Sequence, residues 1–219
     1  MEKMNDGAKD YEVTAVRPLT WQILYDNKYV HIVEGRKKAL LIDSGYGSEA
    51  LREYCRTLTD RPVSRIINNG EEEQSKSDYT REVLREGCQI DLGNRILEVF
   101  RIPCHSIENL VYLDRSNRIL FSEVEFGPFC QLTGSVAQFV KNMEKLIVLR
   151  HDFDVCYGKK GEVDASYVEQ CLALGRDILA GSAVAVKNEG VPENKCLVSG
   201  HSVRIIYDVR NVKKRNVIL

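Results

Sequence analysis

The stretch Ile66-Ile-Asn-Asn-Gly-Glu-Glu-Glu-Gln74 decides how the chain is interpreted. It continues the strand-like run Val63 to Ile67 and places amides and three consecutive carboxylates directly after that run. In open α/β folds, ligand-binding and catalytic groups collect on the loops beyond the carboxyl ends of strands. We therefore expect this segment to line a functional pocket.

The residues before this stretch predict a strand, a helix and a second strand. Ala39 to Ile42 is a continuous apolar run that ends at Asp43, and such a run suits a strand covered on both faces. Ser48 is a suitable N-cap for a helix from Glu49 to Leu58, whose apolar residues recur at positions i, i+3, i+4 and i+7. Pro62 then separates this helix from the strand that leads into the polar stretch.

Three later motifs follow in a definite order. They are Ile102-Pro-Cys-His105-Ser, Asn117-Arg-Ile-Leu-Phe-Ser122 and Phe153-Asp-Val-Cys-Tyr-Gly-Lys-Lys-Gly161. Together with the first stretch they resemble the metallo-β-lactamase superfamily, and the resemblance runs from about Trp21 to Asp208. It implies an α/β fold, an αββα sandwich of two mixed β-sheets flanked by helices, in a protein of hydrolase ancestry.

The resemblance also implies that most of the family's metal ligands are replaced in this chain. The family's signature turn, His-x-His-x-Asp-His, binds two metal ions, usually zinc, and His105 is the one ligand histidine that is retained. The positions of the signature turn correspond to Asn69, Glu71, Glu73 and Gln74. The bridging aspartate falls near Val124, between Glu123 and Glu125, and the last histidine corresponds to Lys160. Because zinc prefers imidazole and thiolate ligands, we expect that the dinuclear zinc site is lost and that no cofactor is bound.

The residues at these positions predict acid–base chemistry without a metal. His105 can exchange a proton near neutral pH, and Glu73 or Glu71 can serve as a general base. Lys160 can stabilise an enolate or an oxyanion in place of zinc. We therefore hypothesise a small-molecule isomerase, lyase, or ester or lactone hydrolase. The residues expected to line its pocket are Asn69, Gln74, Cys104, Glu123, Glu125 and Tyr157.

Three other hypotheses use the same residues. The charged groups can form a salt-bridge plug, which would leave a non-catalytic pseudoenzyme that binds a ligand or acts as a scaffold. Glu71, Glu73, His105 and Glu125 can form a carboxylate-rich site for one manganese, magnesium or iron ion. Cys104 can act as a nucleophile beside His105.

The composition is typical of one globular domain. The 219 residues are 43% hydrophobic and 29% charged, and the net charge of −1 gives no electrostatic case for nucleic acid or an anionic membrane. No apolar run approaches the ~20 residues that span a bilayer, and the polar first residues lack a signal-peptide core, so we expect a cytoplasmic location. We expect residues 1–10 to form a disordered tail, residues 11–210 a single domain and residues 211–219 a basic tail.

Other features concern the thiols, the remaining histidines and possible partners. The seven cysteines include no CxxC pair, which favours free thiols in a reducing compartment. His31, His151 and His201 lie outside the motifs and are expected to be surface or packing residues. The family usually carries an insert after the polar helix expected at 75–86. Its absence predicts a more open pocket and leaves room for a homodimer contact.

Periodicity predicts the remaining elements. The further strands are expected at 12–16, 20–25, 29–34, 95–102, 110–113, 118–121, 155–157, 196–198 and 203–207. Further helices are expected at 135–150, capped by Ser135, and after Asp164. Residues 123–133 are expected to form a loop, and the last two strands a closing hairpin on a sheet edge.

Overall fold

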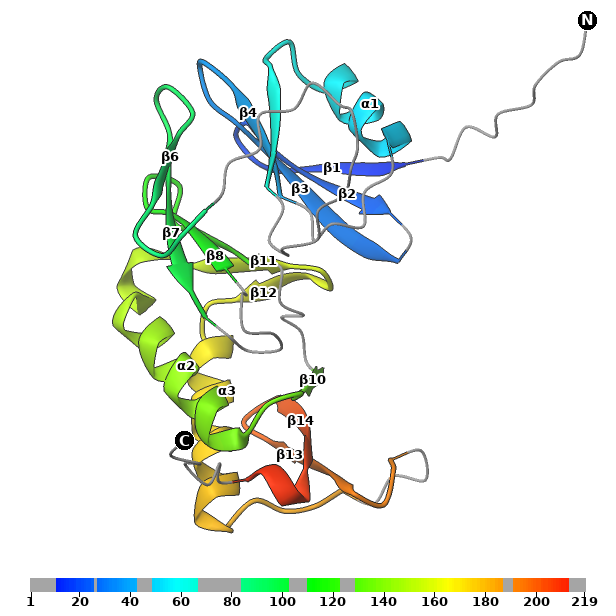
Figure 1. The fold of residues 1–219 in the computed structure, drawn as a ribbon, viewed down its shortest axis with the longest axis vertical. Coiled ribbons are helices and arrows are strands. Elements are labelled where there is room, and N and C mark those ends of the chain that lie inside the picture. The colour runs from blue at the N-terminus through cyan, green and yellow to red at the C-terminus, as the bar shows by residue number, and fades with distance from the viewer. Residues whose placement is uncertain are drawn as a thin grey trace, which may run out of the picture.

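The structure is a computed structural model, and it describes residues 11–25, 27–42, 49–66, 84–102, 110–122, 129–186 and 191–212. These residues form four layers (Figure 1). Helix α1 (Glu49–Thr57) covers one five-stranded sheet, and α2 (Val136–Val148) and α3 (Tyr167–Ala180) cover the outer face of a six-stranded sheet. The predicted αββα sandwich of two mixed sheets is confirmed.

The first sheet has its strands in chain order. They are β1 (Glu12–Arg17), β2 (Thr20–Tyr25), β3 (Lys28–Glu34), β4 (Ala39–Ile42) and β5 (Val63–Ile66). Neighbouring strands are antiparallel except β4 and β5, which are parallel and are connected through α1. This is the strand–helix–strand unit that the sequence predicts.

The second sheet has the order β12-β11-β9-β8-β7-β6. Its strands are β6 (Gln89–Asp91), β7 (Ile96–Arg101), β8 (Leu110–Asp114), β9 (Ile119–Ser122), β11 (Val155–Gly158) and β12 (Gly161–Asp164). Only β9 and β11 are parallel. The short helix η1 (Arg150–Asp152) joins α2 to β11.

A third, three-stranded sheet corrects two predictions. It consists of β10 (Phe129–Gln131), β14 (Val203–Asp208) and β13 (Lys195–Gly200), followed by the short helix η2 (Val209–Asn211), with β14 in the middle. The expected loop 123–133 therefore contains a strand, and the last hairpin does not join the edge of either main sheet. A three-residue strand with one buried residue, Cys130, is too short to show an alternating pattern.

The hydrophobic side chains fill the three spaces between the four layers. In β4, Ala39 and Leu41 pack towards α1, whereas Leu40 and Ile42 pack between the two sheets. The run is thus covered on both faces, as predicted. The third space lies between the second sheet and the helix pair α2 and α3. Because every layer is held by its own apolar contacts, the strands give a fixed frame for the loops at their ends.

The helix boundaries agree with the predictions only in part. Ser135 caps α2, because its side chain accepts a hydrogen bond from the Gln138 backbone N–H at 3.2 Å. Helix α3 begins at Tyr167, whereas Asp164 is the last residue of β12 and accepts from the Ser166 N–H at 2.8 Å. Of the polar helix expected at 75–86, only residues 84–86 are described, and they are not helical.

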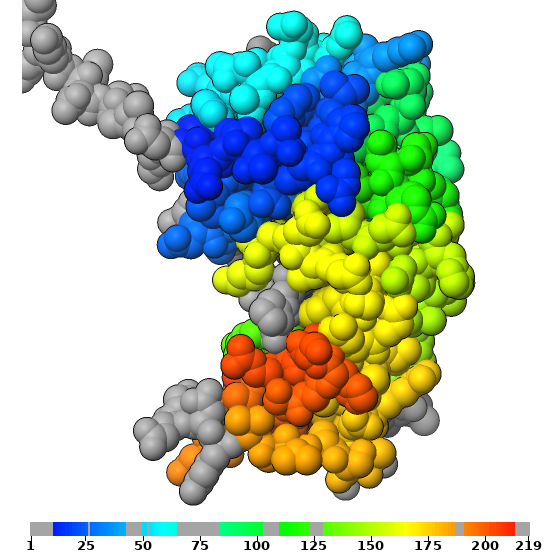
Figure 2. Space-filling model, turned by 180° about the vertical axis from the view of Figure 1, so that it is seen from behind, coloured from blue at the N-terminus to red at the C-terminus, as the bar shows by residue number. Residues whose placement is uncertain are grey.

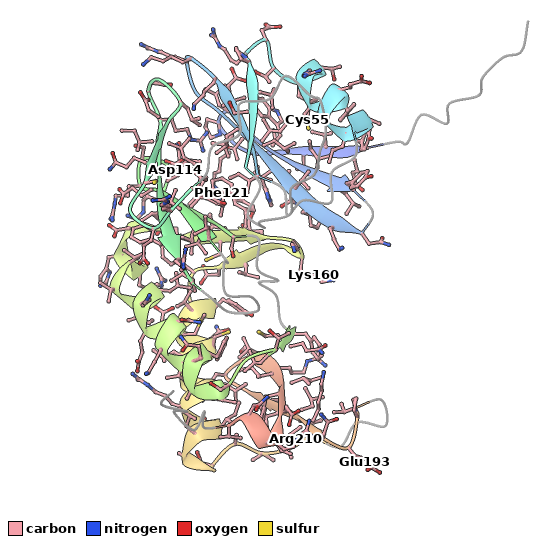
Figure 3. The ribbon with its side chains drawn as sticks, viewed as in Figure 1. Cys55, Asp114, Phe121, Lys160, Glu193 and Arg210 are labelled. Atoms are coloured by element: carbon pink, nitrogen blue, oxygen red, sulfur yellow. The ribbon has the colours of Figure 1, made fainter. Side chains whose placement is uncertain are left out.

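A buried ion pair ties the two main sheets together. Arg95, just before β7, donates to Asp114 at the end of β8 over 2.5 Å, and their side chains are 5% and 0% exposed. The same guanidinium donates to the Leu19 carbonyl at 3.0 Å and to the Thr20 hydroxyl at 2.9 Å, both at the turn between β1 and β2. This connection lies at the opposite end of the second sheet from Lys160 (Figure 3).

Candidate functional site

The strands that precede the predicted site segments end at one end of the sandwich. In the first sheet, Ile42 is the register partner of Ile66, so β4 and β5 stop together. In the second sheet, β7 stops at Arg101 beside the start of β8, and β9 stops at Ser122. We call this end of the two sheets the site end.

The two sheets meet at the site end through one buried histidine. His31 is the register partner of Ile42 in the first sheet. Its ring lies 5.7 Å from the ring of Phe121 in β9 and 5.4 Å from the ring of Tyr157 in β11, centroid to centroid. The carboxyl ends of β4, β5, β9 and β11 therefore lie close together, as expected for a pocket built on loops.

Most of the predicted site residues lie outside the described residues. They are Asn69, Glu71, Glu73, Gln74, Cys104, His105, Glu123 and Glu125. The described strands end where each of their segments begins, so the topology agrees with a common location. Their side-chain arrangement stays a prediction. Among the predicted site residues, only Lys160 and Tyr157 lie in the described ranges.

Lys160 lies at the tip of a tight hairpin. Gly158 and Gly161 are register partners, so Lys159 and Lys160 form a two-residue turn between β11 and β12. The Lys160 side chain is exposed at this tip (Figure 3). Within the described ranges, no carboxylate lies at ion-pair distance from its ammonium group. A two-residue turn carries position 160 beyond the end of the sheet, which accounts for the exposure of its side chain. The pairing of Lys160 with a carboxylate of the predicted site stays a prediction, because those carboxylates lie outside the described ranges.

The hairpin tip is held against the first sheet. The Tyr29 backbone N–H, near the start of β3, donates to the Lys159 carbonyl at 3.0 Å. Gly161 has φ +105°, and a Cβ there would lie 3.2 Å from Cε2 of the Tyr29 ring. Glycine is required because this backbone conformation and this close contact both disfavour a side chain. Lys160 thus projects from a tethered turn.

Tyr157 differs from the pocket-lining position expected for it. Its side chain is buried between the sheets, and its ring stacks on Phe121 at 5.9 Å between centroids. Its hydroxyl donates to Glu162 Oε2 at 2.7 Å, and burial raises the pKa of Tyr157 well above its ordinary value. The cause is strand parity, because Tyr157 is the register partner of Phe121 and faces the first sheet with it.

The other histidines occupy structural positions. Burial lowers the pKa of His31 to about 3, so its imidazole is neutral, with Nε2 3.3 Å from Gln22 Oε1. His151 is exposed, and His201 Nε2 lies 2.9 Å from the Asp177 carboxylate. The expectation of packing or surface roles is confirmed. The sequence did not predict that His31 packs against Tyr157 between the two sheets behind the site end, although both residues belong to strands with buried, apolar neighbours.

A metal site needs several ligand side chains that converge on one point. Within the described residues, no group of three or more His, Cys, Asp and Glu side chains is arranged to hold a metal ion. Six of the seven cysteines are described, and none of these six forms a disulfide bond. Burial raises the pKa of Cys171 to about 12, which makes it a packing residue and not a nucleophile. No helix in the described ranges has the length and apolar character needed to cross a membrane.

The described strands and helices define a four-layer sandwich in which the carboxyl ends of β4, β5, β9 and β11 lie at one end. Several solved metallo-β-lactamase structures share this architecture. The metallo-β-lactamase from Pontibacter korlensis is 18% identical, aligns over 77% of this chain and 100% of its own, and has a TM-score of 0.60. VMB-1 at pH 5.5 is 15% identical, aligns over 78% of this chain and 99% of its own, and has a TM-score of 0.58. The metallo-β-lactamase from Erythrobacter litoralis is 11% identical, aligns over 76% of this chain and 92% of its own, and has a TM-score of 0.57.

The chain therefore has the metallo-β-lactamase fold. No protein-family model matches the sequence, and no curated protein matches it. At these identities the structural likeness establishes the fold and leaves the activity to be argued from the site residues.

Proposed function

We propose that this protein is a metal-independent acid–base enzyme acting on a small ester, lactone or enolisable carbonyl compound at the site end. His105 and Glu73 or Glu71 exchange protons with the substrate, and Lys160 stabilises the negative charge that develops on its oxygen. The observation that supports this most directly is the exposed ammonium of Lys160 on a tethered turn beside the ends of β9 and β11.

The chemistry of the residues present does not fit a pair of zinc ions. Lys160 takes the position of a ligand histidine, and an ammonium group has no lone pair to offer a metal. Asn69 and Gln74 provide amides where the family has imidazoles, and zinc binds these poorly. A cation fixed near the reacting oxygen can supply the electrostatic stabilisation that zinc provides elsewhere.

The exposure of Lys160 favours an enzyme over a salt-bridge plug. A plug needs a buried ammonium paired with a carboxylate, because an unpaired buried charge is costly. The Lys160 side chain is exposed, whereas the carboxylates expected as its partners in a plug, Glu73 and Glu125, lie outside the described residues. An exposed ammonium remains available to an anionic group of a ligand.

A second candidate is a non-catalytic ligand-binding protein with the same fold. The buried residues behind the site end favour it, because the Tyr157 hydroxyl is engaged by Glu162 and His31 is held neutral. Neither group is free to exchange protons with a ligand. Any proton transfer must therefore come from the predicted segments that hold His105, Glu71 and Glu73.

Metal analysis and a substrate panel test the proposal. The purified protein is analysed for bound metals, and then assayed in EDTA against aryl esters, lactones and deuterium exchange at the α-carbon of ketones and thioesters. We expect activity that survives EDTA and that falls by about 100-fold in Lys160→Met, the size typical of losing one electrostatic donor. His105→Gln should also be inactive.

The control is Lys141→Met, because Lys141 is exposed on α2 away from the hairpin tip. It should leave both activity and melting temperature unchanged, and Lys160→Met should leave the melting temperature unchanged. Activity that EDTA abolishes and Mn²⁺ or Fe²⁺ restores would establish the single-metal hypothesis instead. Ligand binding by thermal shift without turnover of any substrate would establish the non-catalytic one.

A further inference from the structure

Strand β1 leaves an open edge on the first sheet. Among the strands that the structure describes it is paired only with β2, and none of its own residues is buried. Figure 2 shows the blue N-terminal strands uncovered on this side of the molecule, between α1 in cyan and β11 and β12 in yellow. An open edge offers unpaired backbone N–H and C=O groups to another strand. The sequence Glu12-Val-Thr-Ala-Val-Arg17 contains neither lysine nor proline, the residues that commonly block such pairing.

The charged side chains of β1 are complementary to those of a second copy of β1 when the two strands pair antiparallel, and not when they pair parallel. The strand begins with Glu12 and ends with Arg17, and Val13 and Val16 lie inside these charges. Antiparallel pairing of two copies brings Glu12 of each next to Arg17 of the other, whereas parallel pairing places like charges side by side. The strand therefore matches itself across a two-fold axis, which is the symmetry of most homodimers.

Both ends of β1 are fixed before any partner binds. Tyr11, just before the strand, stacks on Tyr25 at 5.9 Å and on Tyr54 of α1 at 4.5 Å. At the other end, the Arg17 guanidinium lies 6.0 Å from the centre of the Tyr157 ring. A strand that is already ordered loses little conformational entropy when it pairs.

The size of this edge limits the strength of the contact. The pairing of β1 with β2 is irregular between Ala15 and Arg17, so the regular part of the edge runs from Glu12 to Ala15. Such a short edge buries less than the ~1,200 Å² of a standard interface, which places the contact among weak and reversible ones. Interfaces of about 1,600 Å² range from µM to pM in dissociation constant, so this smaller contact is expected at the µM end of that range or weaker.

We propose that β1 is a self-association edge, at which two copies of this chain pair antiparallel and join their five-stranded sheets into one continuous sheet. The contact is independent of the acid–base chemistry at the site end. The pairing with β2 passes over Val16, because Ala15 is the register partner of Trp21 and Arg17 that of Thr20. When Val16 is passed over in the same way, the register that places Glu12 opposite Arg17 of the partner places Thr14 on the two-fold axis, and the Thr14 side chain is exposed. Each copy therefore presents this position to the same position of its partner.

Sedimentation velocity of the full chain between about 1 and 200 µM tests this contact. The natural chain should shift from monomer to dimer as its concentration rises. Thr14→Lys and Thr14→Glu should each remain monomeric, because like charges then face each other across the axis. An equimolar mixture of these two variants should recover the dimer, which also shows that both variants are folded.

Thr57→Lys is the matched control, since Thr57 is an exposed threonine at the end of α1. It should dimerise like the natural chain. A natural chain that is monomeric at 200 µM would overturn the proposal. The proposal would also be overturned if Thr14→Lys, in the absence of Thr14→Glu, dimerised with a dissociation constant within tenfold of that of the natural chain.

Discussion

Removing the buried guanidinium of Arg95 is expected to destabilise the fold more than removing any surface cation. In Arg95→Met, Asp114 keeps its place with a 0% exposed carboxylate. It retains only the backbone and side-chain N–H groups of Asn117, at 3.1 and 2.9 Å. The Leu19 carbonyl and the Thr20 hydroxyl also lose their donor.

The magnitude follows from the cost of an unpaired buried charge. Breaking a buried pair by removing one partner costs about 3–5 kcal/mol. For a chain of about 200 residues, each kcal/mol lowers the melting temperature by roughly 2–4 °C. We therefore expect Arg95→Met to melt about 10 °C below the natural protein.

Differential scanning calorimetry with two further variants checks the reasoning. Arg115→Met removes a guanidinium that is 42% exposed and paired with Glu98 and Asp152, so it should cost less than about 1 kcal/mol. Arg95→Met combined with Asp114→Leu should recover part of the loss, because no charge is then left unpaired. Equal melting temperatures for Arg95→Met and Arg115→Met would refute the stabilising role of the buried pair. A double variant with a lower melting temperature than Arg95→Met would refute the cost assigned to the unpaired charge.

Two further predictions concern the site end. Burial holds the pKa of His31 at about 3, against ~6.5 in the unfolded chain. As the pH falls, the unfolded state therefore binds a proton before the folded state does. The free energy of unfolding should decrease as the pH drops from about 6.5 towards 3. His31→Phe should remove up to about 1.4 kcal/mol per pH unit of this dependence in urea unfolding between pH 6.5 and 5, and an unchanged slope would contradict it. Gly161→Ala should cost about 1–3 kcal/mol, because its φ of +105° is strained for alanine and its Cβ meets the Tyr29 ring. Gly87→Ala, at φ +85° with no atom within 4 Å, should lose less in the same thermal melt.

The frame of the fold was predictable because its signals are local. The four apolar residues of β4 require cover on both faces, and the structure provides it. The apolar positions of α1 place Leu51 and Cys55 in the core, and Ser135 caps α2 as expected. These patterns depend on backbone periodicity and capping, which the sequence carries directly.

The features that the sequence did not predict depend on tertiary contacts, which leave no local pattern in the sequence. Strand β10 has three residues and pairs with β14, which lies more than seventy positions later in the chain. The hairpin at Lys159 and Lys160 looked like a loop, because β12 is short and half of it is exposed. The meeting of the ends of β4, β5, β9 and β11 was predictable, and the location of the candidate site beyond them stays a prediction. The positions of Lys160 and Tyr157 were not predictable, since they follow from turn length and strand parity.

The separation between frame and site end explains how this fold tolerates the loss of its relatives' metal ligands. The three hydrophobic spaces and the Arg95–Asp114 pair use residues of strands, helices and the opposite end of the sandwich. We therefore expect that exchanges of the residues beyond the strand ends leave these described contacts of the frame in place. Selection on the fold then places little constraint on the chemistry of the loops, so a TM-score of 0.60 is compatible with 18% identity and a different activity. It follows that likeness to metallo-β-lactamases establishes the fold and does not decide the reaction, which the variants at Lys160 and His105 are designed to test.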